Sequence, residues 1–225
     1  MYDLSAERPS TRAQIKSANI PVRFAGLELS DLGPYKGETL DAAKKWLDRL
    51  LNGAVISSPG AKLCGKGLLL IGKPGHGKTT LSCTLVQEAL RKAPQDLWGG
   101  ASFVKRPAFF IDYPKLLRIQ QRSWKDDAED DRDLMDAIYG EAGNDSVKIL
   151  VLDDLGKEYR TASGWAENVF DAVLRARYNA GLPTIVTTNV PLNDWGSVYG
   201  EPMESFAHEA FIPLSVVSLE GDRRK

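Results

Sequence analysis

The residues with the clearest chemical meaning lie at positions 72–80, which read Gly-Lys-Pro-Gly-His-Gly-Lys-Thr-Thr. They fit the GxxxxGK(S/T) pattern, in which glycines let successive backbone N–H groups turn toward an anion at a helix N-terminus. Lys78 can then reach the β and γ phosphates of a nucleotide, and the Thr79 hydroxyl can hold Mg²⁺. The stretch predicts a site for a nucleoside triphosphate and its metal ion. The residues expected to form this site are Gly72, Pro74, Gly75, His76, Gly77, Lys78, Thr79 and Thr80, with no catalytic role for the His76 ring.

Two carboxylates end a second apolar stretch, residues 148–156 (Lys-Ile-Leu-Val-Leu-Asp-Asp-Leu-Gly). Ligands of open α/β sheets lie outside the carboxyl ends of the strands. We therefore expect Asp153 to face Thr79 and to complete the Mg²⁺ coordination, directly or through water. Asp154 is then placed to orient or deprotonate an attacking water. A strand that runs into an Asp-rich turn is the alternative, but the phosphate loop favours the metal site.

The elements that must position these residues alternate along the chain. Strands are predicted at 67–71, 108–112, 147–152, 184–189 and 214–219, and helices at 39–51, 79–91, from about 114, and at 165–180. Alternating strands and helices predict an α/β fold, with a parallel sheet and helices on both faces. Asn189 ends the fourth predicted strand, where it either holds the attacking water and senses hydrolysis or is a turn residue before Pro191.

Composition excludes several classes of protein. The 225 residues are 43% hydrophobic and 26% charged, with a formal net charge of −1, which is ordinary for a globular domain and gives no overall attraction to nucleic acid. Cys64 and Cys83 offer neither a disulfide framework nor metal-ligand spacing. The N-terminal residues have no apolar signal core, and no run approaches the length of a membrane span. We expect a cytoplasmic protein with no membrane contact.

With these motifs in order, the sequence resembles the AAA+ ATPases, and among them the DnaC-type helicase loaders and the IstB-like transposition ATPases. The resemblance covers residues 19–222, and its motifs lie at 19–24, 72–80, 110–117, 150–156, 177–178, 183–189 and 217–221. It implies a P-loop core with a five-stranded sheet, ATP with Mg²⁺, single-stranded DNA, and a partner. That partner is a hexameric replicative helicase for loaders and a transposase for the IstB branch. It also implies Lys78 and Asp154 as catalytic residues, Asn189 as the sensor, and self-assembly through the ATP sites.

The resemblance also suggests how the chain is divided. Residues 1–18 are expected to be a flexible arm, and residues 19–225 an ATPase domain with an inserted helical element at about 113–145 and no C-terminal lid domain. Two arginines common in the family after the fourth strand correspond here to Pro202 and Phe206. Arg175 and Arg177 are candidates to replace them as an arginine finger, which contributes about 10³–10⁵ in turnover.

Charge is unevenly distributed between the second and third predicted strands. Residues 105–125 contain six basic side chains and one acidic one, whereas residues 126–136 contain seven acidic side chains and one basic one. Helical spacing places Lys115, Arg118, Arg122 and Lys125 on one face, with Trp124 available to stack on a base. The face is either a DNA contact or a solvated stripe paired with the acidic run. Four phosphate contacts predict a log–log salt slope near −2.8, from about −0.7 per contact on single strands.

The sequence thus predicts an ATP-dependent loader that delivers a replicative helicase to single-stranded DNA and hydrolyses ATP slowly without its partner. An IstB-like transposition ATPase is one alternative. Another is a nucleotide-dependent adaptor that hardly hydrolyses ATP, which the missing arginines favour. A small-molecule kinase is the least supported, because no acceptor-binding lid is visible in the sequence.

Overall fold

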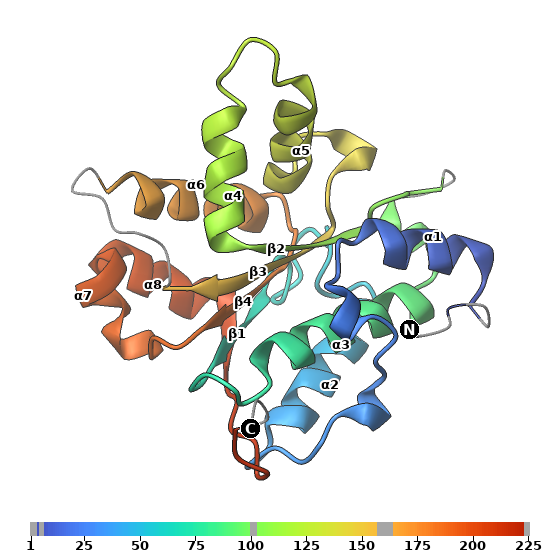
Figure 1. The fold of residues 1–225 in the computed structure, drawn as a ribbon, viewed down its shortest axis with the longest axis vertical. Helices are drawn as coiled ribbons and strands as arrows, with labels where there is room; N and C mark the ends of the chain where they lie inside the picture. The colour runs from blue at the N-terminus through green and yellow to red at the C-terminus, as the bar shows by residue number, and fades with distance from the viewer. Residues whose placement is uncertain (1–3, 5–6, 100–102, 157–163, 223–225) are drawn as a thin grey trace.

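The centre of the molecule is a five-stranded parallel sheet (Figure 1). The computed structural model describes residue 4 and residues 7–99, 103–156 and 164–222. The strands are β1 (Gly67–Ile71), β2 (Ala108–Asp112), β3 (Ile149–Leu155), β4 (Thr184–Thr188) and β5 (Phe211–Ser215). Their order across the sheet is β2-β3-β4-β1-β5. The predicted fold class is therefore confirmed. Because β1 lies beside β4, the loop that follows β1 and the ends of β3 and β4 meet at one edge of the sheet.

Helices cover both faces of the sheet (Figure 1). The helices are α1 (Pro9–Ser17), α2 (Thr39–Leu51), α3 (Lys78–Lys92), α4 (Tyr113–Arg122), α5 (Glu129–Tyr139), α6 (Trp165–Asn179), α7 (Trp195–Tyr199) and α8 (Glu201–Ala210). Short 3-10 turns are η2 (Val22–Phe24), η3 (Leu29–Asp31), η4 (Gln95–Trp98), η5 (Gly143–Asp145) and η6 (Leu192–Asp194). Helices α1 to α3 pack on one face and α4 to α8 on the other. In the part of the chain that the structure describes, no helix is long and apolar enough to cross a bilayer.

Each strand contributes side chains to two separate cores. In β1, Leu68 and Leu70 belong to the core under α1 to α3, whereas Leu69 belongs to the core under α4 to α8. Strands buried on both faces need apolar side chains at every position, not at alternate positions. The continuous apolar runs at 67–71 and 149–152 follow from this arrangement.

Strands β3 and β5 differ from the sequence prediction at both ends, and β4 ends one residue earlier than predicted. Strand β3 begins at Ile149 and continues to Leu155, because its pairing with β4 resumes at Leu155 after an irregularity that follows Leu152. Strand β5 begins at Phe211 and ends at Ser215, whereas residues 214–219 were predicted. The segment after β5 pairs elsewhere: Ser218 forms an antiparallel bridge with Tyr35. Hydrophobic periodicity alone does not show whether a residue of this segment pairs with β1 in the sheet or with Tyr35 outside it.

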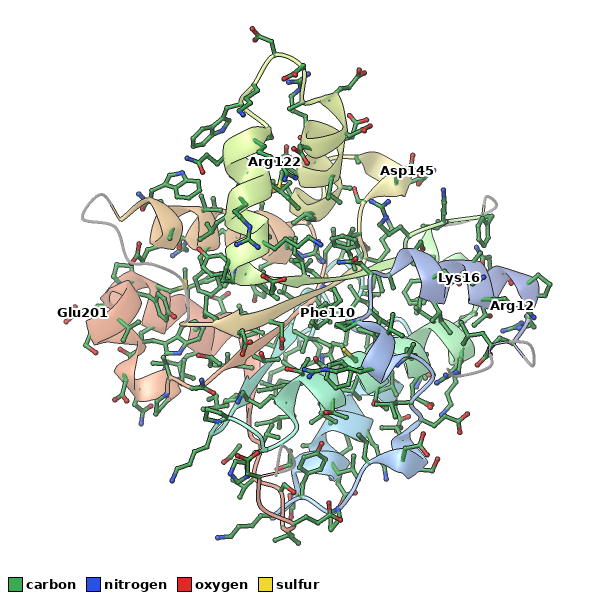
Figure 2. The ribbon with its side chains drawn as sticks, in the orientation of Figure 1. Arg12, Lys16, Phe110, Arg122, Asp145 and Glu201 are labelled. Atoms are coloured by element: carbon green, nitrogen blue, oxygen red, sulfur yellow. The ribbon has the colours of Figure 1, made fainter. Side chains whose placement is uncertain are left out.

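Helix α1 corrects the expectation of a flexible arm over residues 1–18. Thr11, Gln14 and Ile15 are buried, and they recur at helical spacing. The Gln14 amide donates to the Val104 carbonyl at 2.9 Å. The Phe110 N–H (Figure 2) donates to the carbonyl of Ala18 at 2.8 Å, so the chain after α1 covers the outer edge of β2. Residues 9–18 are thus part of the packed domain, while residues 1–3 and 5–6 lie outside the described ranges.

Candidate functional site

The phosphate loop connects β1 to α3 at the carboxyl edge of the sheet. Gly75 and Gly77 have φ of 82° and 88°, a left-handed conformation that residues with a side chain rarely adopt. Gly77 directly precedes α3, so the first N–H groups of that helix, which lack partners within the helix, open onto the loop. The loop therefore has the backbone shape that an anion cradle requires.

Lys78 lies inside this loop, with only 7% of its surface exposed. Its amine donates to the carbonyls of Gly72 at 2.6 Å and Lys73 at 3.0 Å, and to the amide oxygen of Asn189 at 2.8 Å. The predicted lysine and the predicted sensor are therefore in direct contact. The amine is held at the position from which it can turn to a phosphate.

Asp153 lies next to Thr79, as the motif analysis expected. The Thr79 hydroxyl lies 2.9 Å and 3.1 Å from the two carboxylate oxygens of Asp153, which is 5% exposed. A hydroxyl and a carboxylate are the hard oxygen ligands that Mg²⁺ prefers. Together with the anion cradle, this donor set fits a nucleoside triphosphate carrying Mg²⁺.

Thr187 on β4 joins the two acids and was missed by the motif analysis. Its hydroxyl donates to Asp153 Oδ1 at 2.6 Å and accepts the N–H of Asp154 at 2.9 Å. Asp154 has a φ of 61°, and its side chain lines the same cavity as Lys78 and Thr79. The only sequence signal for Thr187 is its place near the end of a strand, two residues before Asn189.

A cavity of ≈ 170 Å³ opens over the loop. Its lining residues are Arg23, Phe24, Pro74, Gly75, Gly77, Lys78, Thr79, Thr80, Asp154 and Asn189. Arg23 and Phe24 come from η2, far from the loop in sequence, and the Arg23 guanidinium lies 4.4 Å from the centre of the Phe24 ring. The cavity is thus lined by the anion-binding loop, by one acid and one amide (Asp154 and Asn189), and by a cationic and aromatic pair (Arg23 and Phe24).

A buried glutamine holds η2 in place. Gln87 on α3 is fully buried. Its amide nitrogen donates to the Phe24 carbonyl at 2.8 Å, and its amide oxygen accepts the Gly26 N–H at 2.5 Å. Because both amide groups of Gln87 are used, the backbone on either side of Phe24 is fixed against α3. The sequence had marked residues 19–24 only as one of the motifs of the family resemblance.

Gly72 and His76 do not line the cavity among the described residues. The Nδ1 atom of His76 accepts the N–H of Ser218 at 3.1 Å, so its ring faces the segment after β5. Gly72 contributes its carbonyl to Lys78, and a side chain here would meet the carbonyl of Val216.

The basic residues proposed to contact DNA lie on a helical hairpin that projects from the sheet, formed by α4 and α5 (Figure 1). Lys115 and Arg118 are exposed on α4, and Arg118 lies 4.0 Å from Asp112. Arg122 donates two hydrogen bonds to Asp131 on α5, and Figure 2 places it between the two helices. Helix α4 ends at Arg122, so Lys125 is not on the predicted helical face.

Trp124 follows α4 and is 63% exposed. One edge of its ring system contacts Trp165 on α6, with ring centres 5.8 Å apart. The indole is thus held against the domain while most of its surface faces solvent. Trp124 and Lys125 remain available at the tip of the hairpin, whereas Arg122 is paired with the acidic run.

The two arginine-finger candidates occupy different environments. Arg177 is fully buried, and its guanidinium donates to the Thr184 hydroxyl and to the carbonyls of Ile138, Val147, Lys148 and Pro183. Burial lowers the pKa of Arg177 to about 9, which still leaves it protonated at neutral pH. A side chain enclosed in this way cannot reach a neighbouring subunit, so this part of the prediction is wrong.

Arg175 lies at the surface of α6. It pairs with Asp171 at 2.7 Å and lies over the Phe206 ring, 4.5 Å from its centre. Phe206 occupies one of the two positions at which the family usually has an arginine. Arg175 therefore remains the accessible candidate of the pair.

Comparison of the sequence with family models and with curated proteins found no match. Comparison of the structure with solved structures found several. A structure of DnaI is 22% identical with a TM-score of 0.63, over 92% of this chain and 95% of that chain. A DnaC helicase loader is 24% identical with a TM-score of 0.61, over 87% of this chain and 99% of that chain. The AMPPCP-bound DnaA from Aquifex aeolicus is 15% identical with a TM-score of 0.59, over 91% of this chain but 53% of that chain.

These similarities cover 87–92% of the chain, although sequence identity is only 15–24%. The strand order, the loop after β1 and the acids at the end of β3 agree with the resemblance that the motifs suggested. The chain has the α/β fold of the structures of DnaI and of a DnaC helicase loader, which it matches over about nine-tenths of its length.

Proposed function

We propose that this protein binds ATP with Mg²⁺ at the loop between β1 and α3 and uses hydrolysis as a switch. The observation that carries the proposal is the contact of Thr79 with Asp153 at 2.9 Å and 3.1 Å. This contact joins the loop after β1 to the acid near the end of β3. Lys78 lies in the same loop, within reach of a bound phosphate. The AMPPCP bound to a DnaA with the same fold supports the choice of nucleotide.

The chemistry assigned to each residue follows from its position. Lys78 and the loop N–H groups would bind the phosphates, and Thr79 and Asp153 would hold Mg²⁺, whose charge would offset that of the phosphates. Asp154 would accept the proton of the attacking water, and Asn189 would orient that water. The water oxygen bonds to the γ phosphorus as the bond to the β–γ bridging oxygen breaks, which leaves ADP and phosphate.

We propose further that the switch serves a helicase loader. The similarity to DnaI and to a DnaC helicase loader spans nearly the whole of those chains, which supports this role over that of a general nucleotide-binding domain. The partners would be a hexameric replicative helicase and single-stranded DNA in the cytoplasm. DNA would bind along the hairpin, through Lys115, Arg118 and Lys125 and through stacking on Trp124.

A nucleotide-dependent adaptor with little turnover is the second candidate. Pro202 and Phe206 occupy the positions of the expected arginines, and Arg177 is enclosed in the core. An adaptor would bind ATP and its partner but hydrolyse ATP at a rate that partner and DNA do not raise. An IstB-like transposition ATPase would instead bind a transposase and double-stranded DNA.

Calorimetry with Mg²⁺–ATP and with ADP tests the nucleotide site directly. Lys78→Ala should weaken ATP binding by at least about tenfold, because hydrogen bonds to charged groups contribute roughly 1.5–3 kcal/mol. Lys92→Ala is a matched control at the other end of α3, where Lys92 is exposed and pairs with Glu88. Unchanged affinity in Lys78→Ala, or no binding by the unmodified protein, would show that the site is wrongly assigned.

Capture of partners with and without ATP separates the remaining candidates. A helicase retained with ATP and released after hydrolysis identifies a loader, and a transposase identifies the IstB-like alternative. Turnover measured with partner and DNA then separates an enzyme from an adaptor. The loader proposal fails if a purified replicative helicase does not bind in either nucleotide state.

A further inference from the structure

Thr187 occupies a position between both acids of the site but does not line the cavity. Its side chain is fully buried. The regular pairing of β3 with β4 is interrupted between Leu152 and Leu155, where the two acids lie. At this interruption the Thr187 hydroxyl accepts the N–H of Asp154.

The direction of these hydrogen bonds is fixed. A hydroxyl carries one hydrogen, and that hydrogen goes to Asp153 Oδ1 because a carboxylate oxygen can only accept. The Asp154 N–H then donates to the Thr187 oxygen. The two hydrogen bonds therefore run in one direction, from the Asp154 N–H to the Thr187 hydroxyl and from that hydroxyl to Asp153. They connect the backbone of Asp154 to the carboxylate of Asp153.

Each acid depends on this link in a different way. Asp153 Oδ1 receives hydroxyl hydrogens from Thr79 and from Thr187, which fix the rotation of the carboxylate. Among the described residues, Asp154 is one of three non-glycine residues with positive φ, and its N–H bond to Thr187 helps to keep that conformation. Asp154 is one of the residues that line the cavity.

We propose that Thr187 is a positioning residue that couples the metal-binding acid to the water-activating acid. This inference rests on the proposed function of the site, since it assigns Asp153 to Mg²⁺ and Asp154 to water. Thr187 touches neither nucleotide nor metal in this scheme. It orients Asp153 toward Thr79 and sets the backbone from which Asp154 reaches the cavity.

The decisive variant is Thr187→Val, because valine keeps the shape of threonine and removes only the hydroxyl. Nucleotide affinity is measured with a fluorescent ADP analogue, in EDTA and in Mg²⁺, and turnover is measured separately. Loss of a group that orients a metal ligand typically costs about 10–100-fold in metal affinity or activity. We expect Thr187→Val to lose about tenfold or more of the affinity gained from Mg²⁺ and of turnover, with affinity in EDTA unchanged.

Two further variants and a control separate positioning from simple packing. Thr187→Ser keeps the hydroxyl and should return both quantities to within about threefold of the unmodified protein. Thr187→Cys, a weak donor, should give an intermediate loss, and it serves if the valine variant does not fold. Thr84→Val makes the same change at a fully buried hydroxyl on α3 that has no hydrogen-bond partner among the described residues. It should behave as the unmodified protein.

The outcomes are distinguishable. A folded Thr187→Val or Thr187→Cys with unmodified Mg²⁺ dependence and turnover overturns the inference. The inference is also overturned if Thr187→Val loses as much nucleotide affinity in EDTA as in Mg²⁺, unfolds more easily, and is not matched by recovery in Thr187→Ser. If the unmodified protein itself gains no nucleotide affinity from Mg²⁺, the proposed function fails before the role of Thr187 is reached.

Discussion

The amine of Lys78 and the amide oxygen of Asn189 lie 2.8 Å apart, although 111 positions separate the two residues in the sequence. Strands β1 and β4 are neighbours, so the residues that follow their carboxyl ends meet. Asn189 is a neutral partner for the amine. The lysine can therefore leave it for a phosphate without separating an ion pair.

Asn189→Asp should impair nucleotide binding, whereas Asn189→Ala should not. A carboxylate at this distance would form a charge-assisted bond with Lys78 and repel the triphosphate, which we expect to weaken ATP binding by about tenfold or more. Alanine removes the partner without adding charge, and ATP affinity should stay within about threefold. Calorimetry on both variants measures the difference. Equal affinities in the two variants would contradict the assigned contact.

Asp154→Asn should separate binding from hydrolysis. The amide cannot accept the proton of water, and general-base catalysis contributes about 10²–10⁴ in rate, so turnover should fall by at least about 10². ATP affinity should change little, because Asp153 and the loop are intact and the Asp154 N–H still donates to Thr187. Phosphate release with DNA and partner present is the measurement. Unchanged turnover would remove Asp154 from the mechanism.

Asp131→Asn should strengthen binding of single-stranded DNA. In the folded protein Asp131 engages Arg122 at 2.8 Å and 2.9 Å, which leaves Lys115, Arg118 and Lys125 for phosphates. Three contacts predict a log–log salt slope of about −2.1, and release of Arg122 should steepen it to about −2.8. The hydrogen bond to Asp131 raises the pKa of Arg122, and an arginine released from such a bond is also protonated at neutral pH.

Titrations of labelled single strands at several salt concentrations give these slopes. Arg118→Glu should weaken binding, while Lys44→Glu, an equal change of charge on the exposed side of α2, should have a smaller effect. A slope near zero in the unmodified protein would exclude DNA binding by this hairpin.

Arg177→Met should destabilise the domain rather than act on catalysis alone. It would remove the guanidinium that donates to the carbonyls of Ile138, Val147, Lys148 and Pro183, and a buried group left without a partner costs about 1–3 kcal/mol. We expect the free energy of unfolding to fall by about 3 kcal/mol or more, which lowers Tm by roughly 6–12 °C at this chain length.

Arg175→Met is the matched comparison on the same helix. Its surface pair with Asp171 is worth about 1 kcal/mol or less, so Tm should barely change. A large loss of turnover in assembled protein at unchanged Tm would identify Arg175 as the arginine finger. Thermal unfolding that is unaffected by Arg177→Met would contradict the role assigned to Arg177.

Sequence by itself determined the elements whose signals are local. The phosphate loop, its preceding strand at 67–71 and its following helix lie within about 25 residues, so spacing and composition were enough to predict them. The acids at 153–154 could be placed because the carboxyl ends of parallel strands share one edge. The second strand was predicted at its observed limits, because a short apolar run between loops is expected to be a buried strand when strands and helices alternate.

Only the tertiary structure decided which residues from distant parts of the sequence complete the site, and which candidate site residues are buried away from it. Thr187, Gln87 and the burial of Arg177 depend on contacts between segments that are far apart in sequence. A polar residue in a strand or helix looks the same in sequence whether it faces solvent, a carbonyl or a catalytic acid. Its partner is set by strand order and helix packing, and these arise from the sum of many long-range contacts that no local pattern records.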